Sequence, residues 1–295
     1  MTTFHEVIER TRRRLMTTQR EAISTLSSAV DAVDTAWPLT TSPRFSENAR
    51  LSCDLEDVYV AGIGSSGANV VRGQYGSTAA EHAIGATVHV NPSWSNWDIA
   101  QAVNDELADL SSPSNGLFRI RSVDFDFLAP TQGYTLSGLQ DFLDVWRVRY
   151  NTPGPSNDWP IVPRDKWRTD QAADTDEFTG GVQIVLREGG WPGHKVRVSY
   201  RATFDALTAI DDDIAAVSGL HAEAHDILSL GAACRLLGGL GAQRALMTTQ
   251  PDPRRSAETQ SRDAAIALGP LMEQREERVR AEAARLARKY PQATR

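Results

Sequence analysis

The chain has 295 residues, of which 41% are hydrophobic and 23% are charged. This balance is that of an ordinary globular protein. It excludes a disordered or fibrous chain, and the length allows one large domain or two smaller ones. No apolar run approaches the ~20 residues that a membrane-spanning helix needs, and the first residues lack the apolar stretch of a signal peptide. We therefore expect a protein that is made and used in a cytosol.

The net charge of −7 hides basic ends on an acidic middle. Residues 1–20 carry five Arg against two Glu, and residues 254–295 carry ten Arg or Lys against six acidic residues. The ends therefore carry +3 and +4, which leaves −14 for the rest of the chain. Basic ends favour contact with acidic partners, although solvated helix faces explain each end equally well. Cys53 and Cys234 are too few and too far apart in sequence for a zinc cluster, and a reducing compartment disfavours a disulfide between them.

The N-terminal segment is predicted to be a helix. Thr3 and Glu6 have the spacing of a capping box, and apolar side chains follow at helical spacing, so we expect a helix over residues 4–18. The next segment, residues 21–92, is rich in Val, Thr, Ser and Gly. It predicts a small antiparallel β-module of about five strands. Its alternating runs lie at residues 30–34, 57–60 and 87–90.

The middle of the chain alternates between helical and extended patterns. Ser95 and Asp98 form a second capping box, and the apolar stripe after it predicts a helix over residues 95–111. Strands are then predicted at residues 118–128, 145–150, 182–186 and 196–200. We expect the last two of these strands to pair as a hairpin. An apolar, Ala-rich helix is predicted over residues 221–237.

A charged helix is predicted near the C-terminal end, over residues 271–289 after Pro270. Its apolar stripe is thin and consists of Met272, Val279, Ala283, Leu286 and Tyr290. A helix that is polar on nearly every face buries little within its own domain. We therefore expect this helix to pack against a partner. Removal of residues 271–295 should then weaken docking while the body of the protein stays folded.

These elements together predict an α+β fold. It has a helical core with a β-hairpin or β-sandwich element, an inserted small antiparallel β-module and a long C-terminal helix. The expected parts are an N-terminal helix of the core at 1–20, the β-module at 21–92, an α+β core at 93–250, and a linker with the charged helix at 251–295.

Two motifs resemble chemical sites but have simpler interpretations. Gly62 to Gly67 matches G-x-G-x-x-G, but a dinucleotide site needs a helix after the third glycine, and a strand is predicted here. A hairpin turn is therefore favoured. His221 and His225 have a spacing that can bind zinc, but Glu223 is one position late for a zinc hydrolase. We expect these two histidines to cap and pack the start of a helix.

Two charged runs also have simpler interpretations. Asp211, Asp212 and Asp213 lack the alternating ligands of a calcium loop, so they predict a helix cap or a loop. The basic run that starts at Arg10 could contact DNA phosphates without sequence preference. It has no interleaved aromatic residues, so a salt-bridged interface with an acidic neighbour is favoured.

Two stretches resemble proteins of tailed-bacteriophage particles. Residues 71–88 read VRGQYGSTAAEHAIGATV and resemble the signature R-G-x-x-G-T-T-A-A-x-H-A-x-G-A-x-V of small β-modules in such particles, with Ser77 at a usual Thr. Residues 145–245 have a strand, a loop with Trp159 and Trp167, a hairpin, an acidic loop and an Ala-rich helix. This order is similar to that of phage head-to-tail adaptor (connector) proteins. The two stretches cover roughly half of the chain.

The resemblance implies a non-enzymatic virion protein of the neck region, assembled in the host cytoplasm. By family it implies a cyclic homo-oligomer, a dodecamer, docked on the portal protein and contacting the next neck or tail-connector protein. Genomic DNA would pass through its lumen without sequence-specific binding. It brings no catalytic residue, cofactor or metal. The expected interface residues are Arg10, Arg12, Arg13, Arg14, Met272, Arg275, Arg278, Val279, Leu286 and Tyr290.

Besides a host interaction protein of unknown role, two other functions remain open at this point. One is a different virion role, such as a minor tail, neck or baseplate protein, because tail and neck proteins both carry the first signature. The other belongs to a different class: a metal-dependent hydrolase that uses His221 and His225. Metal content separates the hydrolase from the virion proteins, and the binding partner separates the virion roles from each other.

Overall fold

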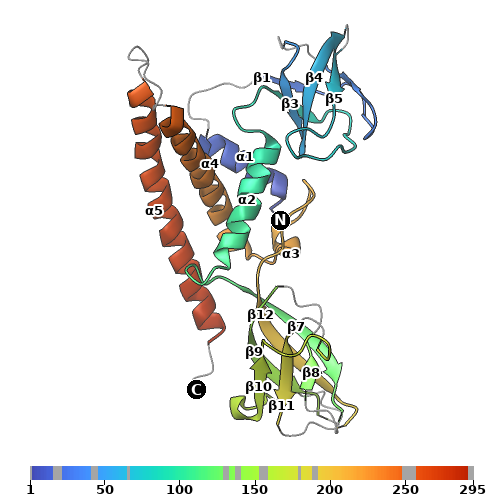
Figure 1. Ribbon diagram of the computed structural model, residues 1–295, viewed down its shortest axis with the longest axis vertical. Coiled ribbons are helices and arrows are strands. Elements are labelled where there is room, and N and C mark those ends of the chain that lie inside the picture. Colours follow the sequence, from blue (N-terminus) through green and yellow to red (C-terminus); the bar gives the residue numbers. More distant parts are fainter. Residues whose placement is uncertain are drawn as a thin grey trace. The chain divides into compact units, whose positions relative to one another are not determined.

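The computed structural model describes most of the chain as two compact units (Figure 1). Unit 1 comprises residues 1–109 and 205–278, and unit 2 comprises residues 110–204 and 279–295. The described residues are 2–15, 22–40, 46–64, 67–128, 133–136, 141–152, 159–178, 181–187, 192–247 and 257–291, without the side chains of 240–267. Helices and antiparallel sheets both occur, which confirms the predicted α+β class. Each unit consists of two segments that lie far apart in the chain. The two units therefore do not coincide with the four consecutive parts that the sequence predicts.

The helices of unit 1 are α1 (Phe4–Leu15), α2 (Asn96–Leu110), α3 (Ile214–Val217), α4 (His225–Met247) and the first part of α5 (Ala257–Lys289). Of these, α1 and α2 begin at the capping boxes that the sequence indicates. Thr3 Oγ1 accepts a hydrogen bond from Glu6 N at 3.3 Å before α1. Ser95 and Asp98 form the complete capping box of α2, with reciprocal bonds of 3.0 and 3.1 Å. These hydrogen bonds confirm both predicted N-terminal caps. Within unit 1, α1 packs on α4.

The β-module of unit 1 is a six-stranded antiparallel sheet in the order β1-β6-β3-β4-β5-β2. Its strands are β1 (Ala22–Thr25), β2 (Ala36–Pro38), β3 (Arg50–Cys53), β4 (Glu56–Gly64), β5 (Gly67–Val71) and β6 (Thr87–Val90). Backbone hydrogen bonds also join the outer strands, because Ser27 N donates to Pro38 O and Thr40 N donates to Thr25 O, both at 2.9 Å. The sheet thus closes into a small barrel, which leaves its outer strands paired.

The interior of the barrel is filled by apolar side chains from every strand of the closed sheet except β1, together with its flanking residue Leu26. Trp37 is the largest of them, and Gly67 passes so close to its backbone that an added Cβ would lie 1.9 Å from the Trp37 carbonyl oxygen. The predicted antiparallel module is confirmed. The strand expected at 30–34 is wrong, since only Val30 pairs there, through backbone bonds with His82. Alternation over so short a run does not by itself hold a strand.

Unit 2 contains two three-stranded antiparallel sheets, in the orders β7-β12-β9 and β10-β11-β8. The strands are β7 (Arg119–Asp126), β8 (Gly133–Thr135), β9 (Phe142–Tyr150), β10 (Trp167–Asp170), β11 (Gln183–Leu186) and β12 (Lys195–Ala202), with a 3-10 turn η1 (Arg164–Lys166). The predicted hairpin of residues 182–186 and 196–200 is wrong. β11 pairs with β10 and β8, whereas β12 pairs with β7 and β9. The two strands are consecutive in the chain, and yet each finds longer-range partners.

α5 differs from the predicted C-terminal helix in extent. It begins at Ala257, and Pro270 lies inside it. The residues before Pro270 are good helix formers, which offset the backbone hydrogen bond that proline removes. Val279 and Leu286 are buried, and the Tyr290 ring meets the Trp146 ring edge-on at 5.1 Å within unit 2. Most of its other described residues are exposed, so the helix buries little of its surface, as the sequence predicts, and contacts the rest of the chain through these few residues.

A buried carboxylate joins three helices of unit 1. The Glu106 side chain of α2 is 1% exposed, and it accepts hydrogen bonds from Arg235 of α4 at 3.1 Å and from Arg275 of α5 at 2.6 Å. Gly231 of α4 leaves the space for it, since a Cβ there would lie 2.0 Å from the Glu106 carboxyl carbon. A deletion of residues 271–295 would remove Arg275, which is one of the two arginines that bind Glu106. Such a deletion would therefore also disturb the body of the protein.

No helix among the described residues is long and apolar enough to cross a membrane. This agrees with the absence of a long apolar run from the sequence.

We expect Arg275→Ala to lower the free energy of unfolding of unit 1 by about 3 kcal/mol, because it leaves a buried carboxylate with one cation instead of two. The control is Arg288→Ala, which removes an exposed arginine from the same helix and should cost less than about 1 kcal/mol. Urea unfolding of both variants measures the difference. Equal losses in the two variants would contradict the structural role of the pair.

Candidate functional site

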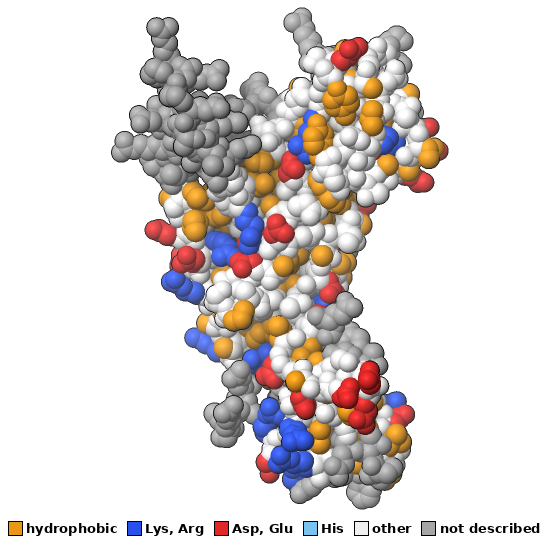
Figure 2. Space-filling view, viewed as in Figure 1, with side chains coloured by type: hydrophobic (Ala, Val, Ile, Leu, Met, Phe, Trp, Pro, Cys, Tyr) orange, Lys and Arg blue, Asp and Glu red, His pale blue; other side chains and the backbone are white. Residues whose placement is uncertain are grey.

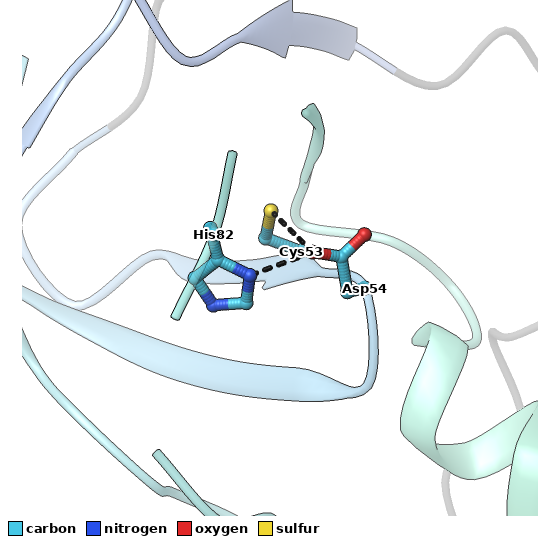
Figure 3. Close-up of side chains that lie close together, drawn as sticks. All are labelled: Cys53, Asp54 and His82. Atoms are coloured by element: carbon cyan, nitrogen blue, oxygen red, sulfur yellow. Dashed lines mark hydrogen bonds and ion pairs between the residues drawn. The ribbon is translucent and has the colours of Figure 1, made fainter. Parts of the chain in front are cut away.

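A cluster of titratable side chains lies at one end of the β-module, around Cys53, Asp54 and His82 (Figure 3). Cys53 is the last residue of β3, and Asp54 opens the two-residue loop between β3 and β4. Asp54 has a φ of +49°, a left-handed conformation that Asp tolerates better than most residues. His82 comes from the long connection between β5 and β6, where its backbone pairs with Val30. Hairpin geometry and one backbone bridge therefore place the three side chains together.

His82 is held between two carboxylates. Its Nδ1 atom lies 2.7 Å from Asp54 Oδ2, and its Nε2 atom lies 2.9 Å from Glu56 Oε2. The ring is fully buried and meets the Trp37 ring edge-on at a centroid distance of 5.3 Å. Burial lowers the pKa of His82, but the bonds to Asp54, Cys53 and Glu56 outweigh it and raise the pKa to about 11. The imidazole is therefore a cation at neutral pH.

Glu56 is the common partner of His82 and Arg72. Arg72 donates two parallel hydrogen bonds of 2.7 Å to the two Glu56 oxygens. Backbone amides of Gly73 and Ala80 add bonds of 3.1 Å each. Burial raises the pKa of Glu56, but the bonds from Arg72 and His82 prevail and hold the pKa at about 2. Each side-chain oxygen of Glu56 thus has several donors.

Arg72 also ties the surrounding loops to this network. Its Nη1 atom donates to the carbonyl oxygens of Asp31 and Asp34 at 2.6 and 2.8 Å, and Nη2 donates to the Ala80 carbonyl oxygen. The guanidinium carbon lies 5.3 Å from the centre of the Trp37 ring. Asp54, Glu56, Arg72 and His82, called the charge network below, therefore connect two loops to the barrel.

Residues 71–88, which resemble the signature of phage β-modules, contain the two cations of this network. These are Arg72 and His82. The glycines Gly73, Gly76 and Gly85 of this stretch have φ of +59°, +87° and +82°, which favours glycine at these positions. The stretch thus encodes a long connection that is fixed by buried charge and by left-handed turns.

The sequence alone did not indicate the metal-ligand set. Cys53, Asp54 and His82 each offer one ligand atom, and these atoms lie within 4.8 Å of one another. Among the described residues this is the group that could hold a metal ion. Burial raises the pKa of the Cys53 thiol, which opposes its use as a nucleophile. The Cys-Asp pair and the distant His carry no metal-motif spacing, so only the barrel brings them together.

The two histidines that the sequence singled out serve the backbone. His221 Nδ1 accepts a hydrogen bond from Glu223 N at 3.4 Å at the start of the 3-10 turn η2 (Ala222–Ala224). His225 is buried and its Nε2 atom lies 3.1 Å from the Leu220 carbonyl oxygen. The capping interpretation is confirmed for His221.

The other two motifs also have structural roles. The glycine-rich run joins β4, which ends at Gly64, to β5, which begins at Gly67, and a strand rather than a helix follows. Ser65 and Ser66 lie outside the described residues. Asp213 caps α3 by accepting a hydrogen bond from Ala215 N at 2.9 Å. The hairpin and helix-cap predictions are confirmed.

The expected interface residues of α1 have unequal exposure. Arg10 and Arg13 are exposed and Arg14 is half-buried. Arg12 is buried instead, where it donates to the Trp94 carbonyl oxygen at 3.2 Å and to the Asn96 side chain. Arg12 thus links α1 to the start of α2. Arg10 and Arg13 are the residues of this set that are open to a partner.

The expected interface residues of α5 lie mostly within the chain. Met272 is 46% exposed, whereas Val279 and Leu286 are buried. Arg275 binds Glu106, and Arg278 binds Asp226 at 2.7 Å. Tyr290 packs on Trp146. Their use as an interface stays a prediction, and it is most direct for Met272.

We expect Arg72→Met to destabilise the β-module by about 3 kcal/mol or more, because it removes one of the two cations that face the buried Glu56 and leaves three carbonyl oxygens without their arginine donor. Arg197→Met is the control, since Arg197 makes the same two-bond contact with Asp124 at an exposed position. Its cost should stay below about 1 kcal/mol. Chemical unfolding compares them, and a small loss for Arg72→Met would show that the network is not a stabilising element.

We also expect His225 to make unit 1 less stable in acid. Burial lowers the pKa of His225 from its ordinary value, despite the opposing Leu220 carbonyl and Asp213 charge, and Arg10 and His221 lower it further. The unfolded chain therefore binds the proton first as the pH falls. This contribution is complete above about pH 6.5 and is lost as the pH falls below it. His225→Gln should flatten the stability profile below about pH 6.5, and parallel profiles for the variant and the wild type in that range would contradict this role.

Comparison with known proteins does not indicate a function, so the function has to be inferred from the residues of the chain. No family model and no curated protein matches the sequence.

Proposed function

We propose that the chain is a structural subunit of a tailed-phage particle and that it forms the adaptor ring below the portal. The observation that carries this proposal is the role of Arg72 and His82. These two residues of the phage-module signature hold the charge network on which the β-module is built. The stretch that resembles the signature therefore supplies the two cations that hold the β5–β6 connection to the barrel.

The chemistry of the charge network supports a structural role. Both ring nitrogens of His82 face carboxylate oxygens, and both oxygens of Glu56 accept several hydrogen bonds. A general acid or base needs an exchangeable proton within reach of a substrate. The imidazole and carboxylate here are instead buried and bound to each other. The network thus resembles a clamp between loops more than a proton-transfer site.

Exposed apolar residues support the use of the β-module as a contact surface. Figure 2 shows hydrophobic side chains on the surface of this module, and its large exposed ones are Ile23, Val33, Ile63, Val71, Tyr75 and Ile84. Exposed apolar surface of this kind favours protein contacts. A closed ring needs two unlike faces on each subunit, because each subunit meets two neighbours by head-to-tail contacts. We propose that the β-module supplies one of these faces.

Basic side chains support the other expected contacts. Arg10 and Arg13 of α1 are exposed, and we propose that they meet acidic groups of the portal protein. Figure 2 also shows Lys and Arg side chains gathered over part of unit 2. Arg147 and Arg149 lie on one face of β9, where each is half-buried. Such a surface suits passing DNA, whose phosphates it would contact without reading the sequence.

Co-purification with the portal protein of the same genome, followed by electron microscopy, tests the proposal. A ring stacked on the narrow end of the portal would support the adaptor role and would give the subunit count. Recovery of the chain in isolated tails would instead support a minor tail or baseplate role. If the chain does not enter the particle at all, the virion role fails and the hydrolase class has to be tested.

We expect Arg13→Glu to weaken co-purification with the portal about tenfold, because it places an anion where a cation meets acidic groups. Arg168→Glu is the matched control, since it makes the same charge change at an exposed residue of β10 in unit 2. Both variants should keep the thermal midpoint of the wild type, because both residues are exposed. Equal portal binding by both variants would remove α1 from the proposed interface.

A further inference from the structure

We propose that Cys53, Asp54 and His82 form a binding site for one zinc ion in the β-module. The ligand atoms are Cys53 Sγ, Asp54 Oδ2 and His82 Nδ1. They come from the end of β3, the β3–β4 loop and the β5–β6 connection. A metal at this point would cross-link the barrel to its longest connection. This inference goes beyond the proposed adaptor function and does not depend on it.

The present distances are close to those that a zinc ion requires. Asp54 Oδ2 lies 2.7 Å from His82 Nδ1 and 3.9 Å from Cys53 Sγ, and all three ligand atoms lie within 4.8 Å of one another. Tetrahedral zinc with bonds of about 2.0–2.3 Å separates its ligand atoms by roughly 3.3–3.7 Å. Shifts on the order of 1 Å in side chains therefore suffice. The Asp54 side chain is 35% exposed, which gives an ion a route from solvent and leaves the fourth position for water.

The second shell of the site is already in place. A histidine that binds a metal through one nitrogen usually donates its other N–H to a carboxylate, which fixes the ring orientation. His82 Nε2 lies 2.9 Å from Glu56 Oε2, and Glu56 is itself held by Arg72. The Nδ1 atom is thereby aimed at Asp54 and Cys53. Glu56 is a positioning residue in this arrangement and not a ligand.

The charge of the cluster stays balanced when zinc enters. Without metal, the carboxylates of Asp54 and Glu56 offset the His82 and Arg72 cations, and Cys53 is a neutral thiol. On binding, the Cys53 thiol and the His82 Nδ1–H each release one proton to solvent, and sulfur and nitrogen each donate an electron pair to the metal. Two positive charges leave and two arrive, so the buried network keeps the same net charge.

The ligand types select zinc over the common hard cations. Thiolate and imidazole are preferred by Zn²⁺, whereas Mg²⁺ and Ca²⁺ require oxygen ligands in larger number. Cys53 is fully buried, which protects a bound thiolate from oxidation. A bound ion would act as a structural clamp, because its ligands come from two separate segments and the barrel core and Trp37 cover the His82 side of the site.

Zinc titration of the full chain after chelator treatment tests the proposal. We expect one equivalent of Zn²⁺ to bind and to raise the thermal midpoint of the protein. Co²⁺ should bind in its place with the charge-transfer absorption of a cobalt–thiolate bond. Failure of the wild type to bind either metal in a one-to-one ratio would overturn the inference.

Variants locate the site and guard against misfolding. Cys53→Ser and Asp54→Asn should each lower the zinc affinity about 100-fold or more, and Cys53→Ser should abolish the cobalt–thiolate absorption. Cys234→Ser is the matched control and should bind like the wild type, because Cys234 lies in α4. Asp54→Asn changes a partly exposed loop residue, so its folding is expected to survive. Unchanged affinity in folded Asp54→Asn, or loss of binding in Cys234→Ser, would overturn the site. None of these outcomes bears on portal binding.

Discussion

A carboxylate that folding removes from water has to find positive charge and hydrogen-bond donors inside the protein. Glu56 does so at the end of the β-module, where Arg72, His82 and two backbone amides surround it. Because these donors come from the connection between β5 and β6, satisfying one buried charge also fixes the path of that connection. The loops at Asp31 and Asp34 are tied to the same arginine. The module is rigid for an electrostatic reason as much as for an apolar one.

A second buried carboxylate with arginine partners lies among the helices of unit 1. Glu106 is buried in α2 and is held by arginines from α4 and α5, which brings together residues more than a hundred positions apart in the chain. Gly231 is the small residue that admits the carboxylate between the helices. The charged character of α5 thus has a function within the chain. Some of its arginines satisfy buried acids, and exposed positions such as Met272 remain open to a partner.

Local sequence signals predicted much of the fold. The capping boxes at Thr3 and Ser95, the antiparallel β-module and the helical character of the chain after residue 204 are all visible in the sequence, because each depends on residues close together in the chain. Long-range pairing was not visible. β11 and β12 look like a hairpin from their order, but β12 finds β7 and β9, and no local signal carries that choice. The early start of α5 was missed for a related reason, since Pro270 was given more weight than the helix formers before it.

The candidate site was partly visible for the same physical reason. Arg72 and His82 were noticed through the signature, but their partners Asp54 and Glu56 lie in a different hairpin and became partners only through the barrel. Cys53 gives no metal signal in the sequence, because the two cysteines are too few and too far apart to suggest a zinc cluster. The α1 run was judged as a unit, although helical geometry buries Arg12 and exposes Arg13. Patterns of charge in sequence do not separate buried pairs from open surface.

The central claim is that this chain is a structural component of a phage particle, and the most direct measurement is its copy number in purified virions. Quantitative mass spectrometry of particles, with the portal protein as the internal standard, gives the ratio of the two chains. The adaptor account predicts equal copy numbers of the two chains. After empty heads are separated from tails, this chain should stay with the heads in the same ratio to the portal protein. A chain that is absent from washed particles would contradict the account.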